Sequence, residues 1–257
     1  MRAEEAWKRV SKPAHDTIAV FDTGVNCAHP DIPCIRGYDA ISHKMDWEGT
    51  DANVHGTHVA SVACSTSHNS IGISGVSDFK VYPVRVLGDS GGGSLFYLAR
   101  GLEHVRRNRP DIRIYNLSLG TGANPPVLAK IIRKLTRDGI HVVAAAGNDG
   151  KNNDIDPHYP ANYLGVVSVG ANTVQGVRAR FSNYGASVRV FAPGENIVAA
   201  WKGGYRYWSG TSMAAPHVAG AIALTGRVPN GTLDLTKLTG YACNEEDLRQ
   251  CKKRCGK

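Results

Sequence analysis

Short apolar runs alternate along the chain with segments in which apolar residues recur every three or four positions. The runs predict strands at 17–22, 80–87, 112–119, 140–147, 165–171 and 188–194. The helical spacing predicts helices at 55–66, 94–107 and 126–139, and a further helix that begins near Ser212. Strands that alternate with helices favour an α/β fold, with a mostly parallel central sheet and helices on both faces. Functional residues are then expected where strands end.

The composition fits one globular domain that spans residues 1–257. Of the 257 residues, 42% are hydrophobic and 20% are charged, which is ordinary for a globular chain. No apolar run is long enough to cross a membrane, so no membrane partner is expected. The net charge is +8, but no aromatic residues are interleaved with the basic clusters at 106–109 and 252–254. This predicts a charge that serves solubility rather than nucleic-acid binding; a polyanion binder is the alternative.

Six cysteines hint at an oxidising compartment. Cys27 and Cys34 bracket the loop CAHPDIPC and could form a disulfide. Cys64 falls on the apolar face of a predicted helix and is expected to be a buried free thiol. The other three lie in a short basic tail at about 242–257, where two of them could bridge: Cys243, Cys251 and Cys255.

Three polar residues stand where a strand ends or a helix begins: Asp22, His55 and Ser212. Taken singly, each residue has a structural explanation, since Asp22 could be a turn residue and Ser212 a helix cap. A serine hydroxyl becomes a nucleophile only with a base in reach, and that base needs an orienting carboxylate. Together, the three residue types predict a nucleophilic serine site.

A fourth residue, Asn148, follows the predicted strand 140–147 in the string VVAAAGNDG. Asparagine before glycine is typical of a turn. A side-chain amide at a strand end could instead donate a hydrogen bond to the oxyanion that forms during acyl transfer.

Five strings, in this order, resemble the subtilisin-like serine proteases (the subtilase family): AVFDTGV, HGTHVASVA, YNLSLG, VVAAAGNDG and SGTSMAAPHVAG. They lie between residue 19 and about residue 223, and the string FSNYG resembles the proteinase K-like branch. The resemblance implies the three-layer subtilisin-like fold and a monomeric serine endopeptidase that acts on polypeptides. It makes Ser212 the nucleophile, His55 the general base, Asp22 its orienting carboxylate and Asn148 an oxyanion donor. A catalytically silent, protease-like binding protein is the alternative.

The resemblance also implies a groove in which a substrate peptide pairs as an added strand. Its two edges and the wall of its main specificity pocket are three short segments: Gly91, Gly92 and Gly93; Ser118, Leu119 and Gly120; and Ala145, Ala146 and Gly147. The small residues of the third segment predict a roomy pocket, and hence broad specificity that favours bulky apolar side chains.

The string HNSIGISG at 68–75 resembles a calcium loop of the family. The resemblance implies Ca²⁺ ligands from the Asn69 side chain, the Ile71 and Ile73 carbonyls and the distant Asp31, all of them hard oxygen donors. A plain surface loop is the alternative, and no organic cofactor is expected.

Family members are usually made with an N-terminal pro-segment, and none is visible in this sequence. A pro-segment or a protein inhibitor is an expected partner. The residue types at the N-terminus lack the apolar stretch of a signal peptide, but the family resemblance predicts an extracellular protein.

Overall fold

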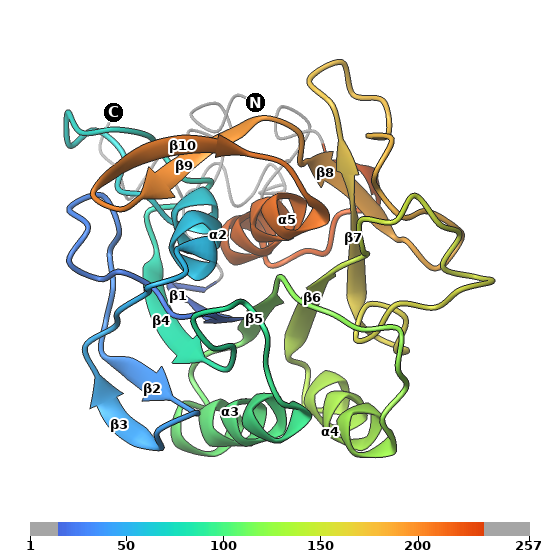
Figure 1. Ribbon diagram of the computed structural model, residues 1–257, viewed down its shortest axis with the longest axis horizontal. Coiled ribbons are helices and arrows are strands. Elements are labelled where there is room, and N and C mark those ends of the chain that lie inside the picture. Colours follow the sequence, from blue (N-terminus) through green and yellow to red (C-terminus); the bar gives the residue numbers. More distant parts are fainter. Residues whose placement is uncertain (1–14, 234–257) are drawn as a thin grey trace, which may run out of the picture.

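The computed structural model describes residues 15–233, and its centre is a nine-stranded sheet (Figure 1). The strand order is β11-β8-β7-β6-β5-β1-β4-β2-β3. The strands are β1 Thr17–Asp22, β2 Gly37–Asp39, β3 Lys44–Trp47, β4 Lys80–Arg85, β5 Ile114–Leu117, β6 His141–Ala145, β7 Val167–Asn172, β8 Val190–Pro193 and β11 Gly231–Thr232. All neighbours are parallel except β2 and β3, which confirms the mostly parallel sheet.

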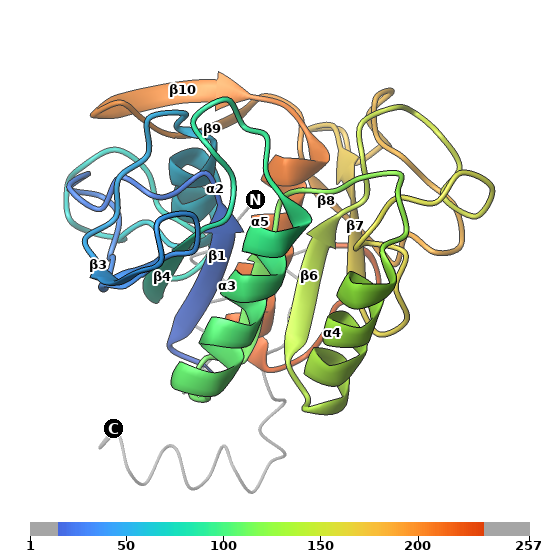
Figure 2. The same cartoon turned by 60° about the horizontal axis from the view of Figure 1, so that its bottom comes forward.

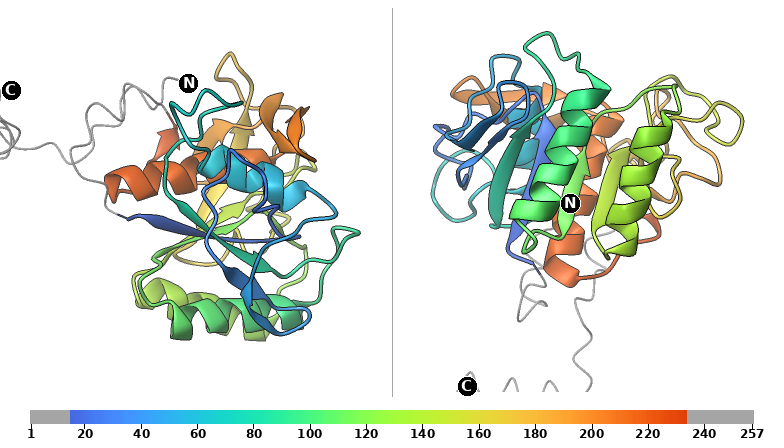
Figure 3. Two further views of the ribbon diagram at one scale, coloured as in Figure 1. Left: turned by 90° about the vertical axis from the view of Figure 1, so that its left-hand side faces the viewer. Right: turned by 90° about the horizontal axis from the view of Figure 1, so that it is seen from below.

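Helices cover both faces of the sheet, which confirms the three-layer fold. Figure 2 shows α3 and α4 side by side on one face, and the left view of Figure 3 shows the sheet between them and the other helices. The helices are α2 His55–Ala63, α3 Leu95–Asn108, α4 Pro126–Arg137 and α5 Thr211–Thr225. A separate antiparallel hairpin, β9 Ile197–Trp201 and β10 Gly204–Trp208, lies over α2 and α5 (Figure 1).

The sheet separates two apolar cores, and β1 contributes to both. Ile18 and Val20 pack in the core that includes residues of α2 and α5, whereas Ala19 and Phe21 pack in the core with α3 and α4. Successive side chains of a strand point to opposite faces, so a strand buried on both faces is apolar throughout. This explains why the strand is apolar at every position from Ile18 to Phe21, between Thr17 and Asp22.

Helix α5 is buried along almost its entire length. Its small residues allow close packing: a Cβ on Gly220 would lie 2.7 Å from Cβ of Val76. A helix held on all sides cannot shift easily, so its first turn, with Ser212, is rigidly placed.

Helix α2 ends three residues before the predicted boundary of 66. The carbonyls of Val62 and Ala63 accept hydrogen bonds from the N–H groups of Val76 and Ser77, on a chain segment that returns beside the helix. These tertiary bonds satisfy the end of the helix, which local spacing does not reveal.

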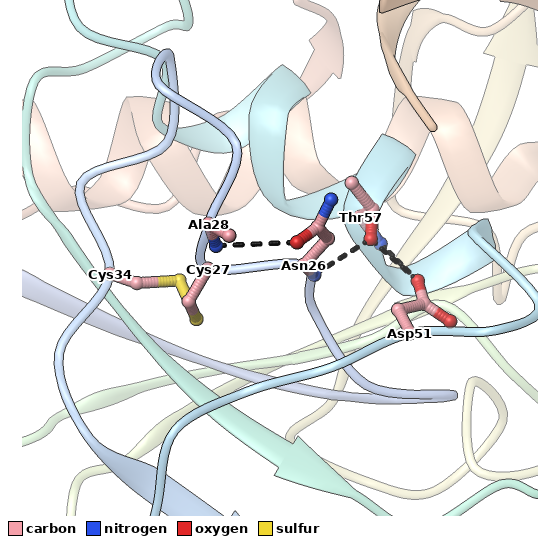
Figure 4. Close-up of a disulfide and its surroundings, with 6 residues drawn as sticks. All are labelled: Asn26, Cys27, Ala28, Cys34, Asp51 and Thr57. Atoms are coloured by element: carbon pink, nitrogen blue, oxygen red, sulfur yellow. Dashed lines mark hydrogen bonds between the residues drawn. A yellow bond between two sulfur atoms is a disulfide. The ribbon is translucent and has the colours of Figure 1, made fainter. Parts of the chain in front are cut away.

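The disulfide between Cys27 and Cys34 is present, as predicted, and closes a short loop after β1 (Figure 4). Cys64 is a buried free thiol just after α2, also as predicted, and burial raises its pKa to about 12. Cys243, Cys251 and Cys255 lie outside the described residues. Within 15–233, no helix has the length and apolar character that spanning a membrane requires.

Candidate active site

The end of β1 and the start of α2 place Asp22 against His55. His55 Nδ1 lies 2.7 Å from Asp22 Oδ1, which also accepts the backbone N–H of Thr23 at 2.7 Å. A carboxylate can only accept here, so Nδ1 carries the hydrogen and Nε2 is left as the basic nitrogen. Asp22 is fully buried, and its Oδ2 has no hydrogen-bond partner among residues 15–233.

Two negative charges act on His55. Burial works to lower the pKa of His55, but the charge and hydrogen bond of Asp22, and the charge of Asp51, raise it above the usual 6.5. The half-buried Trp208 of β10 packs edge-on against the ring, with centroids 5.4 Å apart. The ring is therefore held from two sides while its Nε2 stays basic.

Ser212 stands in the first turn of α5, where a serine at a helix start was predicted. Its Oγ donates to the carbonyl of Ser118 at 3.1 Å, and Ser118 Oγ donates back to the Ser212 carbonyl at 2.8 Å. In the described part of the chain, no hydrogen bond joins Ser212 Oγ to His55. Such bonds are often loose without substrate, and rotation about one side-chain bond redirects the hydroxyl.

Asn148 is held by its amide oxygen, and its amide nitrogen makes no hydrogen bond to residues 15–233. Its Oδ1 accepts both the backbone N–H of Thr211, at 2.8 Å, and the Thr211 hydroxyl, at 3.0 Å. Asn148 is an exposed residue, so its Nδ2 is available as a donor beside the Ser212 turn. The same side chain therefore caps α5 and presents a hydrogen-bond donor.

His58, one turn after His55, has a structural position. Its Nε2 lies 3.1 Å from the Arg206 carbonyl of β10, and burial lowers its pKa to about 4.

Asp51 belongs to the site but was not predicted. It accepts hydrogen bonds from Thr23, Val54 and Thr57, which flank Asp22 and His55. The signal that could have found it is the position of an acidic residue just before a helix start.

The two predicted groove edges face a common cavity. Gly91–Gly93 and Ser118–Gly120 line a mainly apolar cavity of about 490 Å³ that reaches His55. Among the described residues, the backbone groups of Gly93, Leu119 and Gly120 make no hydrogen bond, which leaves both edges open to an added strand.

The predicted pocket wall lies elsewhere. Ala145, Ala146 and Gly147 are buried and do not line this cavity. His158 reaches between the walls: a Cβ on Gly120 would lie 2.2 Å from His158 Nε2, and one on Gly147 would lie 3.2 Å from His158 Cγ. The lack of side chains at both glycines therefore makes room for this ring.

The predicted calcium ligands lie together, but their donors do not fit the ion as arranged. The buried Asp31 carboxylate accepts hydrogen bonds from Asn69 Nδ2, the Ile73 N–H and the Tyr205 hydroxyl, each at 3.1 Å. Asn69 Oδ1 accepts the N–H of Ile71 at 3.0 Å. Exchanging the amide nitrogen and oxygen of Asn69 would therefore lose both this bond and the bond to Asp31. A calcium ion needs several oxygen atoms directed at one point. Here N–H and O–H groups are directed at the Asp31 carboxylate instead. Between residues 15 and 233, no three His, Cys, Asp or Glu side chains gather as a metal site either.

A buried Asp–His pair, a serine at a helix start and a free amide define a serine hydrolase type of site on an α/β fold. The sequence model of the subtilase family matches residues 15–242. This chain belongs to the subtilase family.

Named relatives agree with this assignment. The chain is 40% identical over 223 residues to the thermophilic serine proteinase of Bacillus sp. (strain AK1), covering 85% of this chain and 54% of that protein. It is 41% identical to subtilisin Savinase of Lederbergia lenta, over 80% of this chain and 74% of that protein. The chain thus spans only about half the length of some relatives.

Solved structures show the same fold. A cold-adapted subtilisin-like serine proteinase has a TM-score of 0.72 at 35% identity, with 83% of this chain and 77% of that chain covered. A protease from Pseudoalteromonas arctica has a TM-score of 0.80 at 28% identity, with 93% of both chains covered.

Proposed function

We propose that the protein is a serine endopeptidase that hydrolyses peptide bonds through an acyl-enzyme on Ser212. The observation that carries the proposal is the 2.7 Å contact between Asp22 and His55, on an imidazole whose Nε2 is directed away from the carboxylate. Asp, His and Ser then act as one unit of nucleophile, base and orienting group.

Acylation begins when the Ser212 hydroxyl leaves the Ser118 carbonyl and turns to His55 Nε2. His55 takes the proton as Ser212 Oγ attacks the substrate carbonyl, and Asp22 stabilises the imidazolium. The oxyanion of the tetrahedral intermediate accepts hydrogen bonds from Asn148 Nδ2 and from the Ser212 backbone N–H, which the first turn of α5 does not use.

The intermediate collapses when His55 returns its proton to the leaving amine. Water then enters, His55 takes its proton, and the acyl-enzyme is hydrolysed by the same steps in reverse order. The protein is thereby regenerated with Ser212 free.

Substrates are polypeptides bound as a strand between Gly91–Gly93 and Ser118–Gly120. The cavity beside these edges is lined by Leu95, Leu98, Leu119 and Leu128. We therefore propose broad specificity that favours bulky apolar side chains. Ala145, Ala146 and Gly147 do not line this cavity, so the apolar preference rests on the leucines that do.

The family relation supports further proposals about the protein's setting. One relative is named a minor extracellular protease, from Bacillus subtilis, and is 37% identical over 87% of this chain and 34% of its own length. We propose that this protein is also extracellular, which agrees with its disulfide. We further propose that the protein is a monomer and that the same groove binds a pro-segment or a protein inhibitor.

The test is cleavage of a peptide library, with a covalent serine-directed phosphonate to label the nucleophile. We expect cleavage after large apolar residues and label on Ser212 alone. Label on another residue, or binding of peptides without cleavage, would contradict the proposal and favour the silent binding protein.

A further inference from the structure

We propose that Asp51 is a positioning residue for His55: its carboxylate fixes the turn that leads into α2, and its negative charge acts on the imidazole together with Asp22. The inference rests on the proposed role of His55 as general base.

Both oxygens of the Asp51 carboxylate accept hydrogen bonds. Oδ1 accepts the Thr23 hydroxyl and the Val54 N–H, both at 2.8 Å. Oδ2 accepts the Thr57 N–H at 2.8 Å and the Thr57 hydroxyl at 2.7 Å. Four bonds to two oxygens, all accepted, is the pattern of an ionised carboxylate. Two of the donors are the orphan N–H groups at the start of α2, so Asp51 caps this helix from outside it.

The turn that Asp51 holds is strained. Val54, directly before His55, has φ of 74°, a left-handed conformation that is unfavourable for a β-branched residue. Such a conformation persists only where the surroundings fix it, and residues of this kind cluster at functional sites. The Val54 N–H is fixed by Asp51, and the Val54 carbonyl accepts the first helical bond, from His58 N–H, at 3.0 Å. His55 follows Val54 directly, so the two hydrogen bonds of Val54 fix the backbone from which the His55 side chain extends.

Asp51 also ties α2 to the strand that carries Asp22. Thr23, the next residue after Asp22, donates its hydroxyl to Asp51 and accepts the N–H of Gly56 at 3.1 Å. The carboxylate and the imidazole that must meet are thus joined by a second route besides their own contact. A shift of either element would break both routes.

The network continues to the disulfide loop (Figure 4). Thr57 donates its hydroxyl to Asp51 and accepts the backbone N–H of Asn26 at 2.9 Å, one residue before Cys27. The disulfide to Cys34 closes this loop. The turn before His55 is therefore held against a covalently closed segment.

The charge of Asp51 reaches His55. The groups that face His55 are Asp22 from β1, Asp51 from the turn and His58 from α2, beside the uncharged Trp208 from β10. The Asp22 and Asp51 charges both raise the pKa of His55, against its burial. Removing one of two negative charges makes the imidazolium less stable and the pKa lower.

The test is Asp51→Asn, which keeps the volume and removes the charge. In a Ser212→Ala background, the His55 imidazole is titrated by NMR with and without the substitution. We expect its pKa to fall by about half a unit to one unit. In the active protein, kcat should fall about tenfold or more, with a smaller change in KM, because the ring is less well placed.

Two further variants separate position from charge. Thr57→Val removes the hydroxyl bond to Asp51 and the acceptor of the Asn26 N–H without changing any charge, so kcat should fall several-fold while the His55 pKa stays. Asp39→Asn is the matched control: Asp39 is a buried carboxylate that accepts N–H groups of Ile41 and Ser42 and pairs with Arg85, away from the groups that act on His55. It should move neither quantity.

An unchanged His55 pKa in Asp51→Asn overturns the charge part of the proposal. A kcat in Thr57→Val equal to that of Asp39→Asn overturns the positioning part, and this arm remains if Asp51→Asn does not fold. Activity that survives Ser212→Ala would instead overturn the proposed function, while the NMR shift still reports on Asp51.

Discussion

Helices α2 and α5 cover the same face of the sheet, and each carries a residue of the proposed triad in its first turn, but they are capped by different chemistry. The N-terminus of α2, with His55, is capped by the Asp51 carboxylate. The N-terminus of α5, with Ser212, is capped by the neutral amide oxygen of Asn148. The cap of α2 comes from the turn just before the helix, whereas the cap of α5 comes from a segment that is distant in sequence.

The difference matches the charge that develops at each helix. The N-terminus of a helix is partly positive, which disfavours an imidazolium and favours an oxyanion. At α2 a negative cap offsets that field where His55 must become positive. At α5 a neutral cap leaves the field intact where an oxyanion must form, and Asn148 adds a donor. The caps are therefore suited to opposite charges.

The largest effect should come from removing the reacting groups at the two helix starts. Ser212→Ala and His55→Ala should each lower kcat by more than about a thousandfold, since each removes part of one unit. The double variant should be no worse than the worse single variant. Initial rates on a peptide substrate measure this. A single variant that keeps a tenth of the activity would contradict the assignment.

Asn148→Ala removes the amide donor and the neutral cap together. We expect kcat to fall about a hundredfold to a thousandfold, which is the cost known for removing such a donor in a subtilisin, with a smaller change in KM. Thr211→Ala is the control, because it loses one bond to Asn148 and leaves Nδ2 in place. Equal losses in the two variants would show that Asn148 acts only as a cap.

Each of the two helices also carries a buried neutral histidine, His58 on α2 and His217 on α5. Burial lowers both pKa values to about 4, from the usual 6.5. Between these values the unfolded chain binds protons that the folded protein does not, so stability falls as the pH falls. The expected slope is about 1.4 kcal/mol per pH unit for each histidine. Urea unfolding of Ser212→Ala at about pH 7 and about pH 5 measures it; equal stabilities would contradict the burial.

The smallest effect should come from the hydroxyls that complete the caps. Thr57→Val and Thr211→Ala should each lower the free energy of unfolding by about 1 kcal/mol, the usual net contribution of a side-chain hydrogen bond or cap. Thermal unfolding in the Ser212→Ala background checks this. No change in either variant would show that the caps do not stabilise their helices.

The sequence predicted the part of the fold that local patterns determine. The strands β1, β4, β5, β6, β7 and β8 and the four helices follow from apolar runs and helical spacing, because each buries apolar side chains that its own segment supplies. The predictions missed β2, β3, β9, β10 and β11. Residues 44–46 of β3 and 205–207 of β10 are exposed, so no apolar pattern marks these strands.

In the candidate site, too, the sequence predicted what local patterns determine and missed what tertiary contacts determine. Asp22, His55, Asn148 and Ser212 were identified because each stands in a string that resembles the family. Asp51 was missed because its role depends on bonds to Thr23 and Thr57, which only the fold brings together. The calcium prediction considered which oxygen donors were present, but in the structure Tyr205, 174 residues from Asp31 in sequence, donates to that carboxylate.

The most direct test of the two caps is the pH dependence of kcat/KM in wild type, Asp51→Asn and Asn148→Asp. Only the neutral imidazole can act as base, so activity should rise as His55 loses its proton, and its raised pKa places that rise above the usual 6.5. We expect Asp51→Asn to move the rise to lower pH. Asn148→Asp keeps the capping oxygen but adds a negative charge beside the oxyanion, and should lower the rate at least about a hundredfold at every pH. A rise that stays in place in Asp51→Asn, or a wild-type rate in Asn148→Asp, would contradict the account.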